Sequence, residues 1–154
     1  MGKLMLSSAA FAQGERIPGR YTCGGEGISP PLEWHGLPEG TRAPVLMCVD
    51  PDAPSGAFLH WLVYDIPADA GNLPEDLPPD DTLENGAKHG RNQQGRPGYI
   101  EPCPPGESHR YVFSFYALDE YLNIPARADL KEVLDAMEGH VLAKSELVGL
   151  SDGR

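Results

Sequence analysis

Basic residues are scarce in this sequence, and their scarcity excludes several kinds of partner. Its 154 residues include 12 Lys and Arg against 23 Asp and Glu, a formal net charge of −11 at pH 7. Nucleic acids bind proteins through many cationic contacts, so we expect no nucleic acid partner. The same charge disfavours adsorption to anionic membranes, although a local pocket can hold one phosphate if its lining supplies the donors.

Cysteines and long apolar runs are also few. The three cysteines, Cys23, Cys48 and Cys103, are widely spaced and form no C-x-x-C pair. This pattern argues against a disulfide framework and against a structural zinc site, so we expect no metal, no other cofactor and a reducing, cytoplasmic location. No run approaches the roughly 20 apolar residues of a membrane helix, and we expect no integral membrane association.

Glycine and proline, in contrast, are abundant. The 18 Gly and 16 Pro are spread along the chain, so many turns must separate short ordered segments, which favours a mainly β fold. The chain shows no repeat, low-complexity linker or break in composition. We therefore expect one domain over residues 1–154, as a monomer or a homodimer.

Several strands are predicted from local composition. Residues 1–13 superficially resemble a signal peptide, but serines interrupt the apolar run, and we predict an opening strand there. Residues 45–49, 60–66 and 109–118 are rich in β-formers, and the first two end close to prolines. In the third, alternation gives two largely apolar faces, as expected of a strand covered on both sides. One of these faces carries His109, Tyr111, Phe113 and Phe115.

One helix is predicted from about Asp129 to Glu138. Asp129 and Glu132 have the spacing of a capping box, and Gly139 can end the helix. Apolar residues recur at helical spacing at Leu130, Val133, Leu134 and Met137. Residues 141–148 then read as a last strand.

Asp50, Asp52, His60 and His109 are the candidate functional residues. The two aspartates lie two apart where a strand ends, so their carboxylates can project to the same side, held by neighbouring prolines. Alone, such an acidic corner is more often a structural turn. The two histidines each open a strand directly after a turn region, where pockets form, and this favours a ligand site.

Such a cluster could bind a metal, perform acid/base chemistry or hold an anion. Metal sites usually show short spacings such as H-x-H or H-E-x-x-H, which are absent here. Hydrolysis with Asp50 or Asp52 as base requires pKa values pushed apart, and a Cys103 nucleophile with His109 as base requires an electropositive site. Anion binding needs only a protonated His beside a carboxylate, with backbone and tyrosine donors.

Two further segments stand out. Residues 85–99 concentrate glycines, amides and basic residues, but they match neither G-x-G-x-x-G nor a P-loop, so they form a solvated loop or an interaction surface. Residues 102–106 form a proline-rich run that could fix a pocket wall just before the strand that follows. His35, His89 and His140 are assigned surface or packing roles.

Four blocks in order resemble the phosphatidylethanolamine-binding protein family, which includes Raf kinase inhibitor protein. They are Asp50-Pro-Asp-Ala-Pro54, His60-Trp-Leu-Val-Tyr-Asp-Ile-Pro67, Gly98-Tyr-Ile-Glu-Pro-Cys-Pro-Pro105 and His109-Arg-Tyr111. Ser29-Pro-Pro-Leu-Glu-Trp34 and the opening segment extend the likeness over nearly the whole chain, which is most similar to the short bacterial and archaeal branch.

The resemblance implies a two-sheet antiparallel β sandwich with a Greek-key element, and we expect one or two short helices in its C-terminal half. It implies a non-catalytic protein that binds phosphate or phosphoethanolamine and that could regulate a kinase or protease. An inhibitor acting by surface contacts and a small hydrolase are the alternatives. The implied pocket residues are Asp50, Asp52, Pro54, His60, Pro104, His109 and Tyr111, and the Ala53–Pro54 peptide is a candidate for the cis form.

One departure from the family pattern concerns the same pocket. Relatives usually read G-Y-G-G-P-C-P-P where this chain has Ile100 and Glu101 in place of the second and third glycines. A carboxylate at the pocket mouth would repel an anion unless it points outward or pairs with Arg91, Arg96 or Arg110.

Overall fold

The computed structural model describes residues 3–104 and 106–152, which form two β-sheets and one α-helix. The three-stranded sheet has the order β1 (Met5–Ser7), β2 (Leu32–His35), β5 (Asn72–Leu73). The five-stranded sheet has the order β6 (Lys88–His89), β4 (Phe58–Tyr64), β3 (Val45–Asp50), β7 (His109–Leu118), β8 (Val141–Ser151). Every pairing within the sheets is antiparallel. Helix α1 is Leu130–Met137, and the short 3-10 helices are η1 (Gly19–Tyr21) and η2 (Ala68–Ala70).

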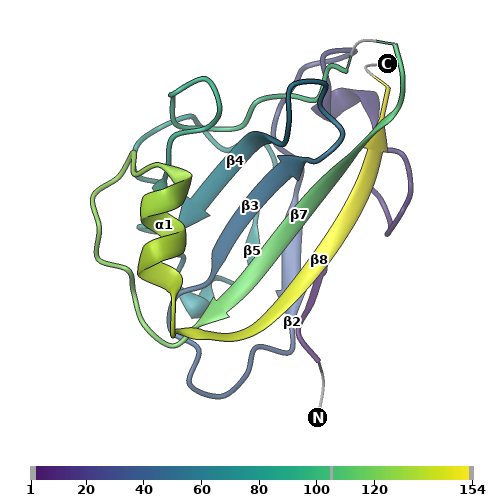
Figure 1. Cartoon of the computed structure of the whole chain (residues 1–154). Helices are drawn as coiled ribbons and strands as arrows, with labels where there is room; N and C mark the ends of the chain where they lie inside the picture. Colours follow the sequence, from purple (N-terminus) through teal and green to yellow (C-terminus); the bar gives the residue numbers. More distant parts are fainter. Residues whose placement is uncertain (1–2, 105, 153–154) are drawn as a thin grey trace.

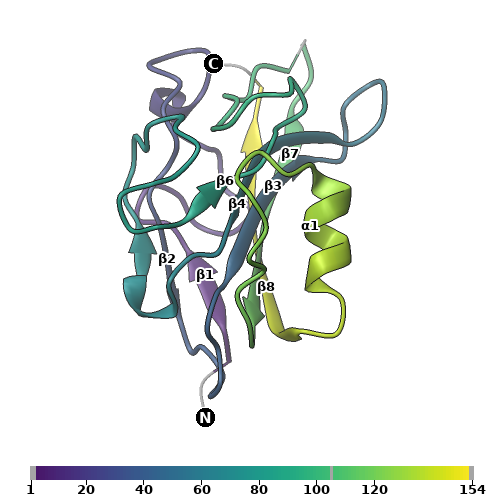
Figure 2. The same ribbon diagram turned by 90° about the vertical axis from the view of Figure 1, so that its left-hand side faces the viewer.

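The five-stranded sheet is covered on both faces, as its composition predicts (Figure 1). On one face the three-stranded sheet closes a core in which Trp34 of β2 stacks on Phe115 of β7, with ring centroids 4.6 Å apart. On the other face, Val133 and Met137 of α1 pack against residues of β3 and β4. Figure 2 shows α1 and the β1–β2 sheet on opposite sides of β3, β4 and β7. The predicted two-sheet sandwich is confirmed.

The predicted elements are present with shifted ends. The strand expected at 60–66 starts two residues earlier and ends at Tyr64, and the last strand continues to Ser151. The opening strand is short, Met5–Ser7, and residues 1 and 2 lie outside the described part. Helix α1 has the predicted capping box: Glu132 N–H donates to Asp129 Oδ1 at 2.8 Å, and the Glu132 carboxylate accepts from Asp129 N–H at 3.1 Å.

A β-bulge in β4 determines where His60 points. Cys48 of β3 pairs with Trp61, but the next residue, Val49, pairs with Leu59, so His60 is the extra residue. A bulge breaks the alternation of side chains. Consequently Leu59 and Leu62 both face the helix side, whereas His60 and Trp61 both face the interior between the sheets.

The chain contains a disulfide that the cysteine spacing did not predict. Cys23 and Cys103 are bonded, with Cα atoms 5.4 Å apart and a sequence separation of 80 residues. The prediction failed because the fold brings the loop after η1 against the segment before β7, which spacing alone does not reveal. The odd count is explained by Cys48, which is fully buried in the core.

The turn after β3 also differs from its prediction. No cis peptide bond occurs among the described residues, so the Ala53–Pro54 peptide is trans. Hydrogen bonds close the turn instead, because Asp52 N–H donates to Asp50 Oδ1 at 2.8 Å and Gly56 N–H donates to Ala53 O at 3.1 Å. Within the same described residues, no helix has the length and apolar character needed to cross a membrane.

Candidate ligand-binding site

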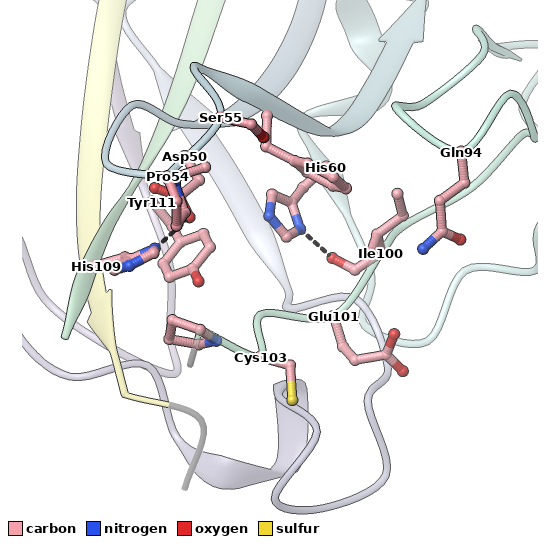
Figure 3. A pocket seen from close by; sticks show the side chains of 13 residues that line it. Asp50, Pro54, Ser55, His60, Gln94, Ile100, Glu101, Cys103, His109 and Tyr111 are labelled. Carbon is pink, nitrogen blue, oxygen red and sulfur yellow. Dashed lines mark hydrogen bonds and ion pairs between the residues drawn. The ribbon is translucent and has the colours of Figure 1, made fainter. Parts of the chain in front are cut away.

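Antiparallel pairing brings Asp50, His60 and His109 to one end of the sandwich. Asp50 ends β3, His60 lies near the start of β4, and His109 starts β7. Because β3 runs antiparallel to both neighbours, its end lies beside their beginnings. Residues separated by up to 59 positions thus surround one cavity (Figure 3).

Asp50 and His109 form a buried pair. His109 Nδ1 lies 2.6 Å from Asp50 Oδ2, and the two side chains are 9% and 5% exposed. A carboxylate can only accept, so Nδ1 is the donor. The other Asp50 oxygen accepts the Asp52 N–H, so both carboxylate oxygens are engaged. This leaves His109 Nε2 for a ligand, since it has no partner among the described residues.

His60 is held in a comparable way by the backbone. Its Nδ1 lies 2.7 Å from the carbonyl oxygen of Ile100, which can only accept, so Nδ1 carries the proton. The ring packs edge-on against Tyr111 at 5.1 Å between centroids and tilts against Phe58 at 4.8 Å. Burial lowers the pKa of His60, and the hydrogen bond to the carbonyl opposes this effect only in part.

Tyr111 contributes the third polar group of this cluster. It lies on the same face of β7 as His109, as alternation predicts, and its side chain is buried. Burial and the nearby charge of Asp50 raise the pKa of its hydroxyl, so the group stays protonated and can donate a hydrogen bond.

The remaining histidines differ from these two in their partners. His89 is also buried, but both of its nitrogens are used: Trp61 Nε1 donates to Nε2 at 3.0 Å, and Nδ1 donates to Asp80 O at 2.7 Å. It is a structural residue. His35 and His140 lie nearer the surface and pair with Glu33 and Asp119. The predicted packing or surface roles therefore describe all three.

The cavity between these groups has a volume of about 320 Å³. Six of the seven predicted site residues line it: Asp50, Pro54, His60, Pro104, His109 and Tyr111. It also takes in Ala53, Ser55, Phe58, Gln94, Ile100, Glu101 and Cys103. The lining thus combines a polar cluster around two imidazoles with apolar walls, an arrangement typical of small-molecule sites.

Asp52 is the seventh predicted residue, and it lies outside the cavity lining. Its carboxylate holds Arg110 through both oxygens, at 2.8 Å to Nη2 and 3.0 Å to Nε, and also accepts the Arg110 N–H at 2.9 Å. These hydrogen bonds lower the Asp52 pKa to about 2. The expectation that the two carboxylates share a side is wrong, because the turn after β3 directs Asp50 inward and Asp52 outward.

Glu101 lies at the cavity mouth but turns its carboxylate aside. Figure 3 shows the carboxylate directed away from His109, and its Oε2 would lie only 2.7 Å from a Cβ at Gly27, so it packs over that glycine. It forms no ion pair among the described residues. Arg91 and Arg110 are paired with other carboxylates, and Arg96 donates to Gln94.

Several lining residues were missed by sequence reasoning. Phe58 could have been found, because it precedes His60 by two residues and so shares its face. Ser55 and Gln94 offer no pattern of their own; Gln94 enters from a loop arranged by the buried Asn92, whose Oδ1 accepts from two backbone N–H groups. Across residues 3–104 and 106–152, no group of three His, Cys, Asp or Glu residues has the arrangement of a metal site.

The fold and this cavity define a class: a β sandwich with a small histidine- and aspartate-lined ligand pocket at one end. The family model described as phosphatidylethanolamine-binding protein matches residues 7–152. The chain belongs to the phosphatidylethanolamine-binding protein family, which the sequence blocks indicated.

Relatives with similar sequences and structures come from bacteria and archaea. A UPF0098 protein of Methanothermobacter thermautotrophicus is 48% identical over 94% of this chain and 96% of its own length, and one of Aquifex aeolicus is 47% identical over 93% and 85%. The crystal structure of a putative homologue from Chlamydia trachomatis has a TM-score of 0.91 at 38% identity, with 98% of each chain covered. YbcL of Escherichia coli has a TM-score of 0.89 at 29% identity, over 99% and 100%.

Proposed function

We propose that this chain is a non-catalytic binding protein whose cavity holds a small anion such as phosphate or phosphoethanolamine. The observation that carries the proposal is the hydrogen bonding of the two pocket histidines. His60 and His109 each use Nδ1–H within the protein and keep Nε2 for a ligand, whereas the structural His89 keeps neither nitrogen. Membership of the family supports a binding role.

The charges around the cavity make this binding dependent on pH. None of the described residues that line the cavity is Lys or Arg, so an anion there would be held by the imidazoles of His60 and His109. Asp50 and Glu101 are the carboxylates in the lining, and Tyr111 stays neutral. Burial lowers the pKa of His60, and an anion beside its ring would favour the protonated form, so binding takes up a proton and affinity should rise as pH falls from 8 to 6.

Calorimetry tests the proposal directly. Phosphoethanolamine and inorganic phosphate are titrated into the protein at pH 6 and pH 8. We expect binding heat that is larger or tighter at pH 6 and that His109→Ala abolishes. His35→Ala is the matched control, because this histidine lies on β2 with its side chain 73% exposed, and it should bind like the wild type. Identical isotherms for wild type and His109→Ala contradict the proposal.

Enzymatic use of the same carboxylates finds less support. Both oxygens of Asp50 accept hydrogen bonds, and both oxygens of Asp52 hold Arg110, so neither group is placed as an unoccupied base. A panel of phosphate and carboxylate esters should therefore show no turnover. Turnover that Asp50→Asn abolishes would overturn the non-catalytic assignment.

Regulation of a kinase or protease is the second candidate, with the segment Asn85–Tyr99 as the contact surface. This candidate is supported by the order of the segment, because an ordered loop can present a fixed surface to a partner. Asn92 Oδ1 accepts from the Gln94 and Arg96 N–H groups, and Asn92 Nδ2 donates to Gly98 O. Inhibition that survives His109→Ala but is lost when the exposed Arg91 and Arg96, which do not line the cavity, are replaced by alanine would favour this function. Inhibition lost in both variants would place it in the cavity instead.

A cytoplasmic location belongs to the same proposal. Disulfides in cytoplasmic proteins are usually transient, and they serve catalysis or redox sensing. In that location we expect the exposed Cys23–Cys103 bond to be reduced and reformed. Fractionation of cells with an antibody against the chain tests the location. Recovery from a secreted or periplasmic fraction contradicts it.

A further inference from the structure

The Cys23–Cys103 disulfide joins the cavity wall to the N-terminal loop. Cys103 and Pro104 line the cavity, and Cys23 follows η1 in the loop that packs beneath that wall. Figure 3 shows the Cys103 sulfur pointing away from the two histidines. The bond therefore lies behind the wall, where it holds the wall in place without occupying the ligand space.

Few other hydrogen bonds hold this wall, which comprises residues 100–104. At its start, Ile100 is tied to His60 by two hydrogen bonds, from Ile100 N–H to the His60 carbonyl at 2.9 Å and from His60 Nδ1 to the Ile100 carbonyl. Beyond that point, the one hydrogen bond among the described residues joins Cys23 N–H to Pro102 O at 3.1 Å. Among the described residues, the disulfide of Cys103 and the hydrogen bond of Pro102 thus both join residues 101–104 to Cys23.

The same bond is accessible to a reductant, whereas the third cysteine is not. Cys23 and Cys103 are both exposed residues. Cys48 is 0% exposed, and burial raises the pKa of its thiol well above the ordinary value, so it stays an unreactive thiol. Thiol–disulfide exchange is therefore confined to the pair behind the wall.

We propose that the Cys23–Cys103 disulfide is a redox switch that sets the ligand affinity of the cavity. This inference rests on the proposed anion binding. A dithiol reductant of the thioredoxin class, or dithiothreitol, transfers two electrons and two protons to the S–S bond: one thiolate attacks a sulfur, the mixed disulfide is resolved by the second thiol, and the products are two protein thiols and the oxidised reductant.

The oxidised state should bind more tightly because its wall is preorganised. In the reduced state, residues 101–104 lose their covalent tie to Cys23 and sample more conformations, so ligand binding must order them again. We expect affinity to fall about tenfold on reduction, which corresponds to about 1.4 kcal/mol. Reoxidation should restore it.

The test compares three forms by calorimetry with phosphoethanolamine at pH 6: oxidised wild type, wild type reduced with dithiothreitol, and the double variant Cys23→Ser/Cys103→Ser. A free-thiol assay checks each state. We expect the last two forms to bind alike and more weakly than the first, and Cys48→Ala to respond to reductant as the wild type does. Equal affinity in both redox states, with binding still lost in His109→Ala, overturns the switch and leaves the proposed function intact.

Hydrogen exchange gives a second readout that needs no ligand. The Cys23 amide reports on the wall directly, because it donates to Pro102 O, and the Ile100 amide serves as an internal reference tied to β4. Reduction of the wild type should accelerate exchange at Cys23 and leave Ile100 unchanged. Unchanged exchange at both amides overturns the switch even if phosphoethanolamine does not bind, and reversal by reoxidation excludes a misfolded variant as the cause.

Discussion

Two acid–base pairs lie side by side where β3 meets β7, and they differ in burial. Asp50 and His109 approach to 2.6 Å with side chains 5% and 9% exposed, whereas Asp52 and Arg110 approach to 2.8 Å with side chains 32% and 57% exposed. Both pairs come from the same two short motifs. The buried pair orients an imidazole toward a cavity, and the exposed pair fastens the turn to the outside of β7.

Alternation along β7 explains why the pairs separate. His109 and Arg110 are adjacent and so must point to opposite faces of the strand. The turn after β3 matches this arrangement, because Asp50 accepts the Asp52 N–H and the chain reverses between them. Each carboxylate therefore follows its partner, one inward and one outward. We therefore expect the same substitution to reduce stability and ligand binding more at Asp50 than at Asp52.

The largest expected effect is that of Asp50→Ala. The substitution leaves the His109 Nδ1–H and the Asp52 N–H without their acceptor, in a pair whose side chains are both buried. Removing one partner of a buried pair typically costs about 3 kcal/mol or more. We expect the free energy of unfolding in urea to fall by about this amount and phosphoethanolamine binding to be lost.

Asp50→Asn removes the negative charge at this position but keeps nearly the same side-chain shape. The amide oxygen can still accept from His109, so this variant should recover part of the stability lost in Asp50→Ala. Its free energy of unfolding should therefore lie between those of the wild type and Asp50→Ala. If Asp50→Ala destabilises the protein no more than Asp52→Ala does, burial does not distinguish the stability contributions of the two pairs.

The sequence predicted the frame of this site better than its details. The period of two in β7 placed His109 and Tyr111 on one face, and proline marked the end of β3; both depend on local geometry. The inward turn of His60 depends on a bulge, and strict alternation along β4 would place it with Leu62 on the helix side. Such a register shift is fixed by pairing across strands, which a single strand does not encode.

The disulfide shows a second limit of the same kind. Counting three cysteines excluded a pairing that the fold makes, because the partners are 80 residues apart and meet only when η1 packs beneath the cavity wall. The split between Asp50 and Asp52 was likewise missed, since the strand period stops at the turn that follows β3. Both features depend on tertiary packing, and the local sequence pattern therefore could not predict them.

A medium-sized effect should appear in the pH dependence of stability through His60. Burial lowers its pKa in the folded protein below the ordinary value of 6.5. As pH falls through that value, the unfolded chain takes up a proton that the folded chain does not, so the free energy of unfolding falls. In His60→Gln this component disappears, and the loss between pH 7 and pH 5 should be smaller, by at most about 1.4 kcal/mol per pH unit.

Urea unfolding at several pH values without ligand measures this difference. His89 is buried and its pKa is lowered in the same direction, but it is present in both proteins and cancels in the comparison. His35→Gln is the control and should keep the pH dependence of the wild type, because this side chain is exposed. A wild type and His60→Gln with parallel curves would show that burial of His60 does not act in this way.

The smallest effect is expected for Asp52→Asn, on the exposed side. Both Asp52 and Arg110 keep contact with water, so their attraction is screened, and it should weaken further with added salt. The Asp52 pKa is lowered to about 2 from 3.8, so its stabilising contribution is present above pH 4 and is lost as pH falls toward 2. The wild type and Asp52→Asn should therefore differ slightly at pH 6 and converge in acid. Phosphoethanolamine affinity should be unchanged, since Asp52 does not line the cavity; a loss as large as that of Asp50→Ala would mean that the turn, and not the buried pair, holds the site together.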